Sequence, residues 1–239
     1  MTADWDAFLM LHRDLPREGP GEAADVAWAA EVAGTPTDAR ILDAACGPGG
    51  DIAALLKVAP RGHVTACDLI AHFVAAVRKA HGDDPRVTAL ESDMTTLSGP
   101  FDLIWCAGAV YFVGVTEALT AWRRALAPGG AIAFSEACWF SDTPSDAARR
   151  NFADYPAMTD ETGIRARIAA AGFDVLATKR LSDRAWENYL APLDERVAKL
   201  RPQADEPLSR VLDAQEAEAA LWRAERDSFG YLLCVVRPA

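Results

Sequence analysis

The stretch Ile41-Leu-Asp-Ala-Ala-Cys-Gly-Pro-Gly-Gly-Asp51 begins as an apolar run and ends in a turn that contains three glycines. A short apolar run followed by such a turn is typical of a buried strand that leads into a helix. In an open α/β sheet, ligands bind at the carboxyl ends of the strands. The turn after this strand therefore belongs to a binding site, and its residues decide which ligand fits.

Outward from this stretch, short apolar runs alternate with helical patterns as far as Phe140. This alternation predicts an α/β fold, a doubly wound parallel sheet covered by helices on both faces. A sixth strand is expected at Phe173–Leu181 and a final one at Ser228–Ala239. The roughly forty mostly helical residues between them are far more than a hairpin needs, so we expect an insertion over the ligand edge.

The composition narrows the class of protein. The chain has 239 residues and a formal net charge of −11, which argues against a nucleic-acid or anionic-membrane partner. No run of ~18 apolar residues predicts a membrane span, and the start lacks the basic region of a signal peptide. The five scattered cysteines are expected to be small buried side chains in a reducing compartment. We therefore expect a cytoplasmic protein.

The glycine turn does not match the common nucleotide-binding motifs. Gly47 and Gly49 fit the first two positions of the dinucleotide fingerprint, but Ile52 occupies the third. The lysine of a phosphate-binding P-loop is also missing. Asp43, just before the turn, would repel a pyrophosphate and would suit a ligand that carries an ammonium group. These residues favour a ligand with positive charge.

Two further carboxylates follow the next two strands. Asp68 ends the second strand, where an acid can accept hydrogen bonds from both hydroxyls of a ribose. Asp93 follows the third strand and can accept a hydrogen bond from an adenine amino group, with Met94 as an apolar contact to the ring. A lone Asp after a strand is usually a helix cap. Three in succession beside a glycine turn favour an adenosine-containing ligand.

These motifs resemble those of the class I S-adenosylmethionine-dependent methyltransferases over about residues 40–140. Asp43-Ala-Ala-Cys-Gly-Pro-Gly49 is similar to the family's acid and glycine-rich turn, with Ala45 in place of the first glycine. The segments Phe101–Phe112 and Leu126–Glu136 are similar to the family's fourth and fifth strands. Narrower matches near the start and after the fifth strand resemble a group of bacterial small-molecule methyltransferases that has no settled substrate.

The resemblance implies a Rossmann-like, seven-stranded, doubly wound sheet with an antiparallel last strand, and S-adenosyl-L-methionine as the cofactor. Residues 1–239 would form a single methyltransferase domain, with an N-terminal helical arm (1–38), a cofactor-binding core (39–140) and a last part (141–239) that contains a helical lid insertion at about 185–226. The residues that the resemblance places around the cofactor are Asp43, Cys46, Gly47, Gly49, Asp68, Leu69, Asp93, Met94 and Cys106.

The acceptor of the methyl group would lie beyond the fourth and fifth strands. Glu136, at the end of the fifth strand, is our candidate for a base or substrate anchor, and Tyr111 for a residue that orients the substrate. A cap or solvated acid for Glu136, and a packing role for Tyr111, are the structural alternatives. In the arm, Arg17 could bind a carboxylate of the cofactor or substrate, whereas His12 is more simply a packed histidine.

The leading hypothesis is methyl transfer to a small-molecule acceptor, with no nucleic acid, membrane or metal as partner and with a homodimer left open. RNA or protein methylation, and a non-catalytic S-adenosylmethionine-binding protein, are alternatives. A nicotinamide-dependent oxidoreductase is a further one, disfavoured by the incomplete fingerprint. The sequence leaves the acceptor atom open.

Overall fold

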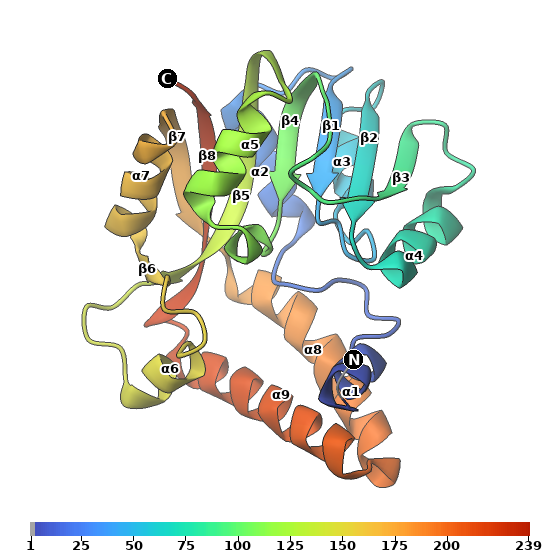
Figure 1. The fold of residues 1–239 in the computed structure, drawn as a ribbon, viewed down its shortest axis with the longest axis vertical. Helices are drawn as coiled ribbons and strands as arrows, with labels where there is room; N and C mark the ends of the chain where they lie inside the picture. The colour runs from blue at the N-terminus through green and yellow to red at the C-terminus, as the bar shows by residue number, and fades with distance from the viewer. Residues whose placement is uncertain (1–2) are drawn as a thin grey trace.

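The computed structural model describes residues 3–239, and a mixed β-sheet forms its centre (Figure 1). The strands are β1 (Arg40–Ala44), β2 (His63–Asp68), β3 (Val87–Glu91), β4 (Phe101–Cys106), β5 (Leu126–Trp139), β6 (Thr159–Asp160), β7 (Phe173–Arg180) and β8 (Phe229–Pro238). Their order is β3-β2-β1-β4-β5-β8-β7, with the short β6 paired to β5. The first five strands run parallel, and β8 lies antiparallel between β5 and β7. The expected seven-stranded order with an antiparallel last strand is confirmed. β6 was not foreseen.

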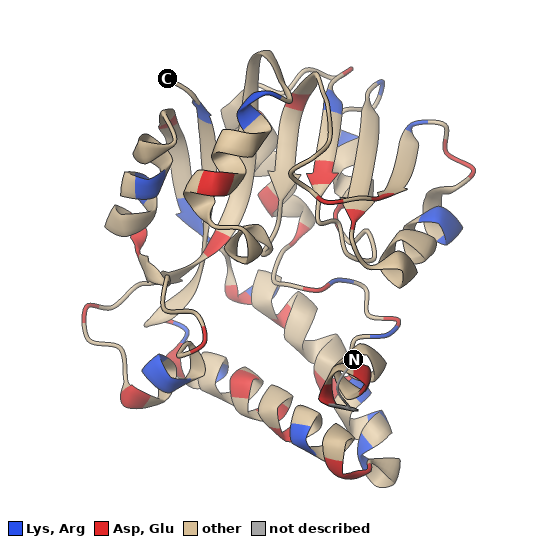
Figure 2. Ribbon diagram, in the orientation of Figure 1, with Lys and Arg blue, Asp and Glu red and all other residues tan. Residues whose placement is uncertain are grey.

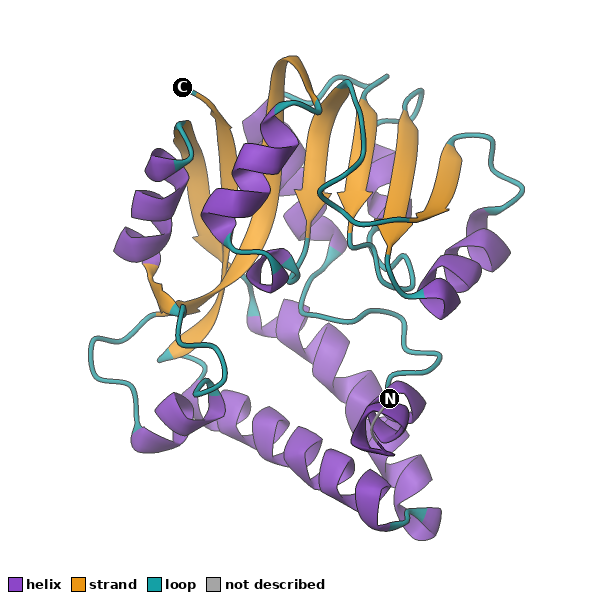
Figure 3. Cartoon of the chain, in the orientation of Figure 1, coloured by secondary structure: helices purple, strands orange, loops and turns teal. Residues whose placement is uncertain are grey.

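The helices alternate with the strands as the pattern predicted (Figure 3). They are α1 (Ala3–Leu11), α2 (Ala23–Ala33), α3 (Ile52–Val58), α4 (Ala71–His81), α5 (Val115–Arg123), α6 (Asp146–Asn151), α7 (Glu161–Ala170), α8 (Asp183–Leu200) and α9 (Glu206–Glu225), with 3₁₀ turns η1 (Val110–Phe112) and η2 (Arg201–Gln203). Several boundaries follow from local chemistry: Gly34, with a φ of 65°, ends α2 in the left-handed conformation. Ser182 and Asp205 cap α8 and α9 by accepting backbone N–H bonds.

Two apolar clusters cover the two faces of the sheet. One contains Val26, Ile52, Leu55 and Trp222, and the other contains Leu119, Trp122, Ile164 and Ile168. Because strand residues such as Ile41 and Leu42 are fully buried on opposite faces, the strands need apolar side chains throughout. Four of the five cysteines are buried in this way and Cys46 is partly buried, all as free thiols.

The third apolar cluster lies away from the sheet. Leu11 and Leu15 of the N-terminal arm pack there with Leu193, Leu208 and Leu212 of α8 and α9. These two helices lie between β7 and β8 in sequence and beyond the carboxyl ends of the parallel strands in space (Figure 1). The arm therefore divides into two parts, since α1 joins the helical cover whereas α2 packs against the sheet.

Candidate active site

The glycine turn after β1 has an unusual backbone. Ala45, Gly47 and Gly49 all have positive φ, at 57°, 52° and 91°. A side chain on Gly49 would meet Ile52 and Val77 at 3.0 Å or less, and one on Gly50 would meet the carbonyl oxygen of Pro16 at 2.8 Å. The glycines are therefore needed for two reasons, which are the left-handed backbone and the close approach of the N-terminal arm.

Asp43 lies beneath this turn as a buried carboxylate with a free oxygen. It is 3% exposed, and its Oδ2 atom has no hydrogen-bond partner within residues 3–239. Burial, and then the nearby charges of Asp51 and Asp68, raise the pKa of Asp43 well above its ordinary value, although Arg17 opposes this. A buried carboxylate oxygen without a partner is costly unless a ligand supplies a donor. The turn therefore presents an unsatisfied acceptor to the pocket above it.

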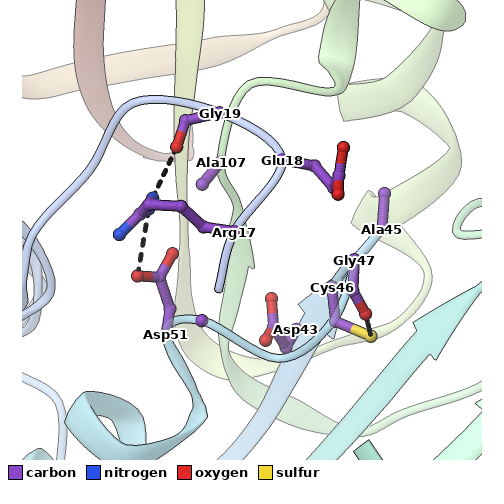
Figure 4. Close-up of a pocket in the computed structure, with 10 residues that line it drawn as sticks. Arg17, Glu18, Gly19, Asp43, Ala45, Cys46, Gly47, Asp51 and Ala107 are labelled. Carbon is purple, nitrogen blue, oxygen red and sulfur yellow. Dashed lines mark hydrogen bonds and ion pairs between the residues drawn. The ribbon is translucent and has the colours of Figure 1, made fainter. Parts of the chain in front are cut away.

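The pocket is bounded by the arm on one side and the glycine turn on the other (Figure 4). Its lining consists of Arg17, Glu18, Gly19, Asp43, Ala45, Cys46, Gly47, Gly50, Asp51 and Ala107. Of the predicted cofactor residues, Arg17, Asp43, Cys46 and Gly47 share this lining, whereas Gly49, Asp68, Leu69, Asp93, Met94 and Cys106 are not part of it.

Sequence reasoning missed Asp51 and Glu18. Asp51 receives hydrogen bonds from Trp105 Nε1 at 3.0 Å and Arg17 Nη2 at 3.3 Å, so it fixes the arginine over the turn. Glu18 pairs with the buried His12 through a 2.6 Å contact between Oε2 and Nδ1. Asp51 stood in the quoted motif, but only the fold shows that a residue of the arm reaches it.

Asp68 organises the turn from the end of β2. Its two oxygens accept hydrogen bonds from the backbone N–H groups of Gly47 and Ile70, both at 2.9 Å. The neighbouring Leu69 is 67% exposed. The role of Asp68 toward a ribose stays a prediction, and the structure adds that the same side chain holds the glycine turn in place.

Asp93 makes the local contacts of a capping residue. It accepts hydrogen bonds from the backbone N–H and the hydroxyl of Thr95, at 2.7 and 2.6 Å, and these bonds lower the pKa of its carboxyl. Met94 and Cys106 are buried in the apolar cluster around Trp122. The predicted contacts of Asp93 and Met94 with an adenine, and of Cys106 with the cofactor, stay predictions.

A second group of polar side chains lies at the end of β5. Glu136 is 1% exposed, and its Oε1 atom accepts a hydrogen bond from the Tyr155 hydroxyl at 2.7 Å. Its Oε2 atom has no hydrogen-bond partner in the part of the chain that the structure describes. Burial raises the pKa of Glu136 to about 7, while Tyr155 and Arg167 act in the opposite direction. The tyrosine ring of Tyr111 lies 5.8 Å from that of Tyr155 in an edge-to-face contact. The predicted residues Glu136 and Tyr111 are thus close to one another through Tyr155.

Comparisons with known proteins agree with this geometry. A family model described as a methyltransferase domain matches residues 41–130. The trans-aconitate 2-methyltransferase of Streptomyces avermitilis is 33% identical over 207 residues, which cover 80% of this chain and 77% of that protein. This chain belongs to the class I S-adenosylmethionine-dependent methyltransferases.

Other similar proteins agree with this family. The malonyl-[acyl-carrier protein] O-methyltransferase of Enterobacter lignolyticus is 38% identical over 99 residues, which cover 41% of this chain and 38% of that protein. Crystal structures of S-adenosylmethionine-dependent methyltransferases from Geobacter sulfurreducens and Thiobacillus denitrificans, both with S-adenosyl-L-homocysteine, share the fold. They superpose with TM-scores of 0.81 and 0.80, at 21% and 20% identity, over 97–98% of this chain and 98% of each of those chains.

The pocket of this methyltransferase fits its cofactor, S-adenosylmethionine. The cofactor carries an ammonium and a sulfonium, and the free Oδ2 atom of the buried Asp43 is the kind of acceptor that an ammonium satisfies. A pyrophosphate would instead meet the carboxylates of Asp43 and Asp51. Membership of this family thus replaces the nicotinamide alternative.

Proposed function

We propose that this methyltransferase methylates a small-molecule acceptor and that Glu136 takes up the proton that the acceptor loses. The observation that carries the proposal is the state of Glu136 at the end of β5. It is buried, one oxygen is held by Tyr155 and the other is free, and burial brings its pKa to about 7. A base with a pKa near the working pH has the best balance between being deprotonated and accepting a proton.

When bound, the cofactor would supply a methyl group on a sulfonium. The acceptor would bond to the methyl carbon as the carbon–sulfur bond breaks, with S-adenosylhomocysteine as the leaving group. The chain's own task is to align the acceptor, exclude water and remove a proton. The Tyr155 hydroxyl fixes the orientation of Glu136, so that the free Oε2 atom is available to accept the proton of an O–H, N–H or S–H group. The helices α8 and α9 lie beyond this edge of the sheet and cover it (Figure 1).

Two observations support a small molecule over RNA. One similar protein is named for trans-aconitate, a small molecule. The net charge of −11 opposes binding to a phosphate backbone, and Lys and Arg residues are interspersed with acidic ones over the face seen in Figure 2. No helix within residues 3–239 is long and apolar enough to cross a membrane. The cytoplasmic location and the homodimer stay predictions.

To test this proposal, the purified protein is incubated with fractions of a cell extract and with S-adenosylmethionine that carries a labelled methyl group. We expect label in a product of the small-molecule fraction, and none in the RNA or protein fractions. With the labelled acceptor in hand, Glu136→Gln should lower the rate of transfer by about 100-fold or more, the scale of general-base catalysis. It should leave S-adenosylhomocysteine affinity within about twofold.

The matched control is Glu195→Gln on the exposed surface of α8, which should transfer at the wild-type rate. Label recovered in RNA or protein would contradict the small-molecule acceptor. If Glu136→Gln transferred the methyl group at the wild-type rate, Glu136 would not be the base. The chain would then contribute only the alignment of the acceptor and the exclusion of water.

A further inference from the structure

Glu18 is a carboxylate of the N-terminal arm that lines the cofactor pocket and has a free oxygen. Its Oε2 atom contacts His12 Nδ1 at 2.6 Å, whereas its Oε1 atom is buried and has no hydrogen-bond partner among the described residues. Burial raises the pKa of Glu18, and the bond from His12 opposes this. In the same pocket, Asp43 Oδ2 is the other unpartnered carboxylate oxygen among the described lining residues. Two such oxygens in one pocket call for a ligand with more than one donor group.

Glu18 and Asp68 both lie next to Gly47 of the glycine turn. A Cβ atom on Gly47 would lie 3.3 Å from the Cγ atom of Glu18, and the N–H of the same glycine bonds to Asp68. The negative charge of Asp68 is close enough to raise the pKa of Glu18 further, although it is the smallest of the contributions. Glu18 therefore lies near Asp68, the acid at the position that binds a ribose in this kind of fold.

The two carboxylates differ in their capacity to accept further hydrogen bonds. Each oxygen of Asp68 already accepts one from a backbone N–H, of Gly47 or Ile70. The Oε1 atom of Glu18 accepts none from the described residues. A ribose presents two adjacent hydroxyl donors, so the oxygen with free capacity is the better partner for at least one of them.

The arm holds Glu18 in place through several contacts. His12, which is 4% exposed, stacks on Phe8 with ring centroids 3.9 Å apart while it bonds to Glu18. Farther along the arm, the N–H of Gly21 donates to the Ala185 carbonyl and the side chain of Asn188 donates to the Gly21 carbonyl. Helix α8 thus holds the arm in place, and Glu18 already lies beside the glycine turn before a ligand binds.

We propose that Glu18 is a further cofactor-binding residue, which accepts a hydrogen bond from a ribose hydroxyl of S-adenosylmethionine beside Asp68, and that His12 positions it. The proposal rests on the cofactor and is independent of which acceptor is methylated. It assigns the arm a direct role in cofactor recognition, in addition to its packing against α8 and α9.

The test is calorimetry of S-adenosylhomocysteine binding to the full chain. Glu18→Gln, which keeps the size of the side chain, should weaken binding by about tenfold, the loss expected for one charge-assisted hydrogen bond. The control Asp6→Asn makes the same chemical change on the exposed surface of α1 and should bind within about twofold of wild type. Thermal unfolding of each variant establishes that it is folded.

An analogue of S-adenosylhomocysteine without both ribose hydroxyls gives the decisive comparison. Wild type and Glu18→Gln should bind this analogue within about twofold of one another, because the group that Glu18 contacts has been removed. An equal loss for both ligands, or no loss for either, would overturn the proposal. If wild type did not bind S-adenosylhomocysteine, the assignment of the cofactor would be wrong, and the role proposed for Glu18 would be wrong with it.

The positioning role of His12 has its own measurement. His12→Phe removes the bond to Glu18 and should weaken S-adenosylhomocysteine binding by about threefold to fivefold. In the double variant with Glu18→Gln, the loss should equal that of Glu18→Gln alone, since the histidine acts through the carboxylate. Additive losses would show that His12 only stabilises the arm.

Discussion

The cofactor edge and the acceptor edge of this sheet are built in different ways. At the ends of β1 and β2, the glycine turn follows directly after Asp43 in sequence, and side chains of the N-terminal arm and Asp68 of β2 reach this turn from elsewhere in the chain. At the end of β5, Glu136 meets Tyr155, which lies 19 residues later in an irregular segment, under helices that come later still. A contiguous sequence motif therefore forms the centre of the first edge, whereas the second edge has no such motif.

Both edges contain a buried carboxylate with a free oxygen, but in different chemical states. Asp43 has only other acids and the already paired Arg17 around it, so its burial is unfavourable until a donor arrives. Glu136 keeps one hydrogen bond to Tyr155 and has a pKa of about 7, so it can exchange a proton near neutral pH. The cofactor edge is therefore arranged to bind charge, and the acceptor edge to move a proton.

The largest effect is expected at Asp43. Asp43→Asn keeps the shape but removes the charge, and should weaken S-adenosylmethionine binding by about 100-fold or more, because a charged hydrogen bond is lost in a buried site. It should also raise the melting temperature by a few degrees near neutral pH. The folded state raises the pKa of Asp43, so the stabilising contribution of this group is complete below its ordinary pKa and is lost as pH rises.

Calorimetry and thermal unfolding check the two halves of that prediction. The control Asp38→Asn changes an exposed residue just before β1 and should alter neither quantity. Loss of stability without loss of affinity would mean that Asp43 is a structural residue, and the contrast between the two edges would disappear.

Asp68→Ala should have the next largest effect on the cofactor edge. We expect cofactor binding weaker by ~1–3 kcal/mol, the scale of charge-assisted hydrogen bonds. Unlike Asp43→Asn, it should also lower the melting temperature, because the N–H groups of Gly47 and Ile70 lose their acceptors. Asp83→Ala, on an exposed loop, is the control. Wild-type affinity in Asp68→Ala would show that the carboxylate supports the turn alone.

The contrast between the edges also explains what the sequence could predict. The seven-stranded α/β sheet and its antiparallel last strand were predicted from the apolar runs and the family resemblance, and Asp43 and Cys46 stand together in the family's motif. The bond between Glu136 and Tyr155 had no local signal, since Tyr155 lies in a segment without periodic pattern. Glu18 had no signal either, because only the fold shows that the N-terminal arm lies against the glycine turn.

The pH dependence of methyl transfer tests the acceptor edge. If Glu136 is the base, the rate should fall about tenfold per unit below a midpoint near the pKa of about 7 and level off above it. The Tyr155 bond lowers the pKa of Glu136, so Tyr155→Phe should move the midpoint to higher pH. If wild type and Tyr155→Phe had the same dependence of rate on pH, Glu136 would not be the group that takes up the proton.

Stability gives an independent reading of the same group. Because the folded pKa of Glu136 lies above its ordinary 4.5, its stabilising contribution is full below that pH and is lost as pH rises through about 7. Glu136→Gln, whose amide oxygen can still accept the Tyr155 hydrogen bond, should flatten this fall in melting temperature. An unchanged slope would mean that the carboxyl titrates near its ordinary value.

The smallest effect is expected at Ala45, the residue that departs from the glycine of the family's motif. Its φ of 57° is in the left-handed region, where an alanine costs about 1–2 kcal/mol. Ala45→Gly removes this strain but adds freedom to the unfolded chain, which offsets about 0.4–1 kcal/mol. We therefore expect a gain in stability of about 0–1.6 kcal/mol, measured by denaturant unfolding, with cofactor affinity within about threefold.

Ala45→Val supplies the opposite change at the same position. A β-branched side chain is a genuine outlier at positive φ, so this variant should lose stability where the glycine variant gains it. It should also weaken cofactor binding, because Ala45 lines the pocket and the turn is shared with the ligand. If glycine destabilised the protein and valine did not, the turn would have a different backbone from the one described, and the cofactor edge would no longer be the part of this molecule that local sequence determines.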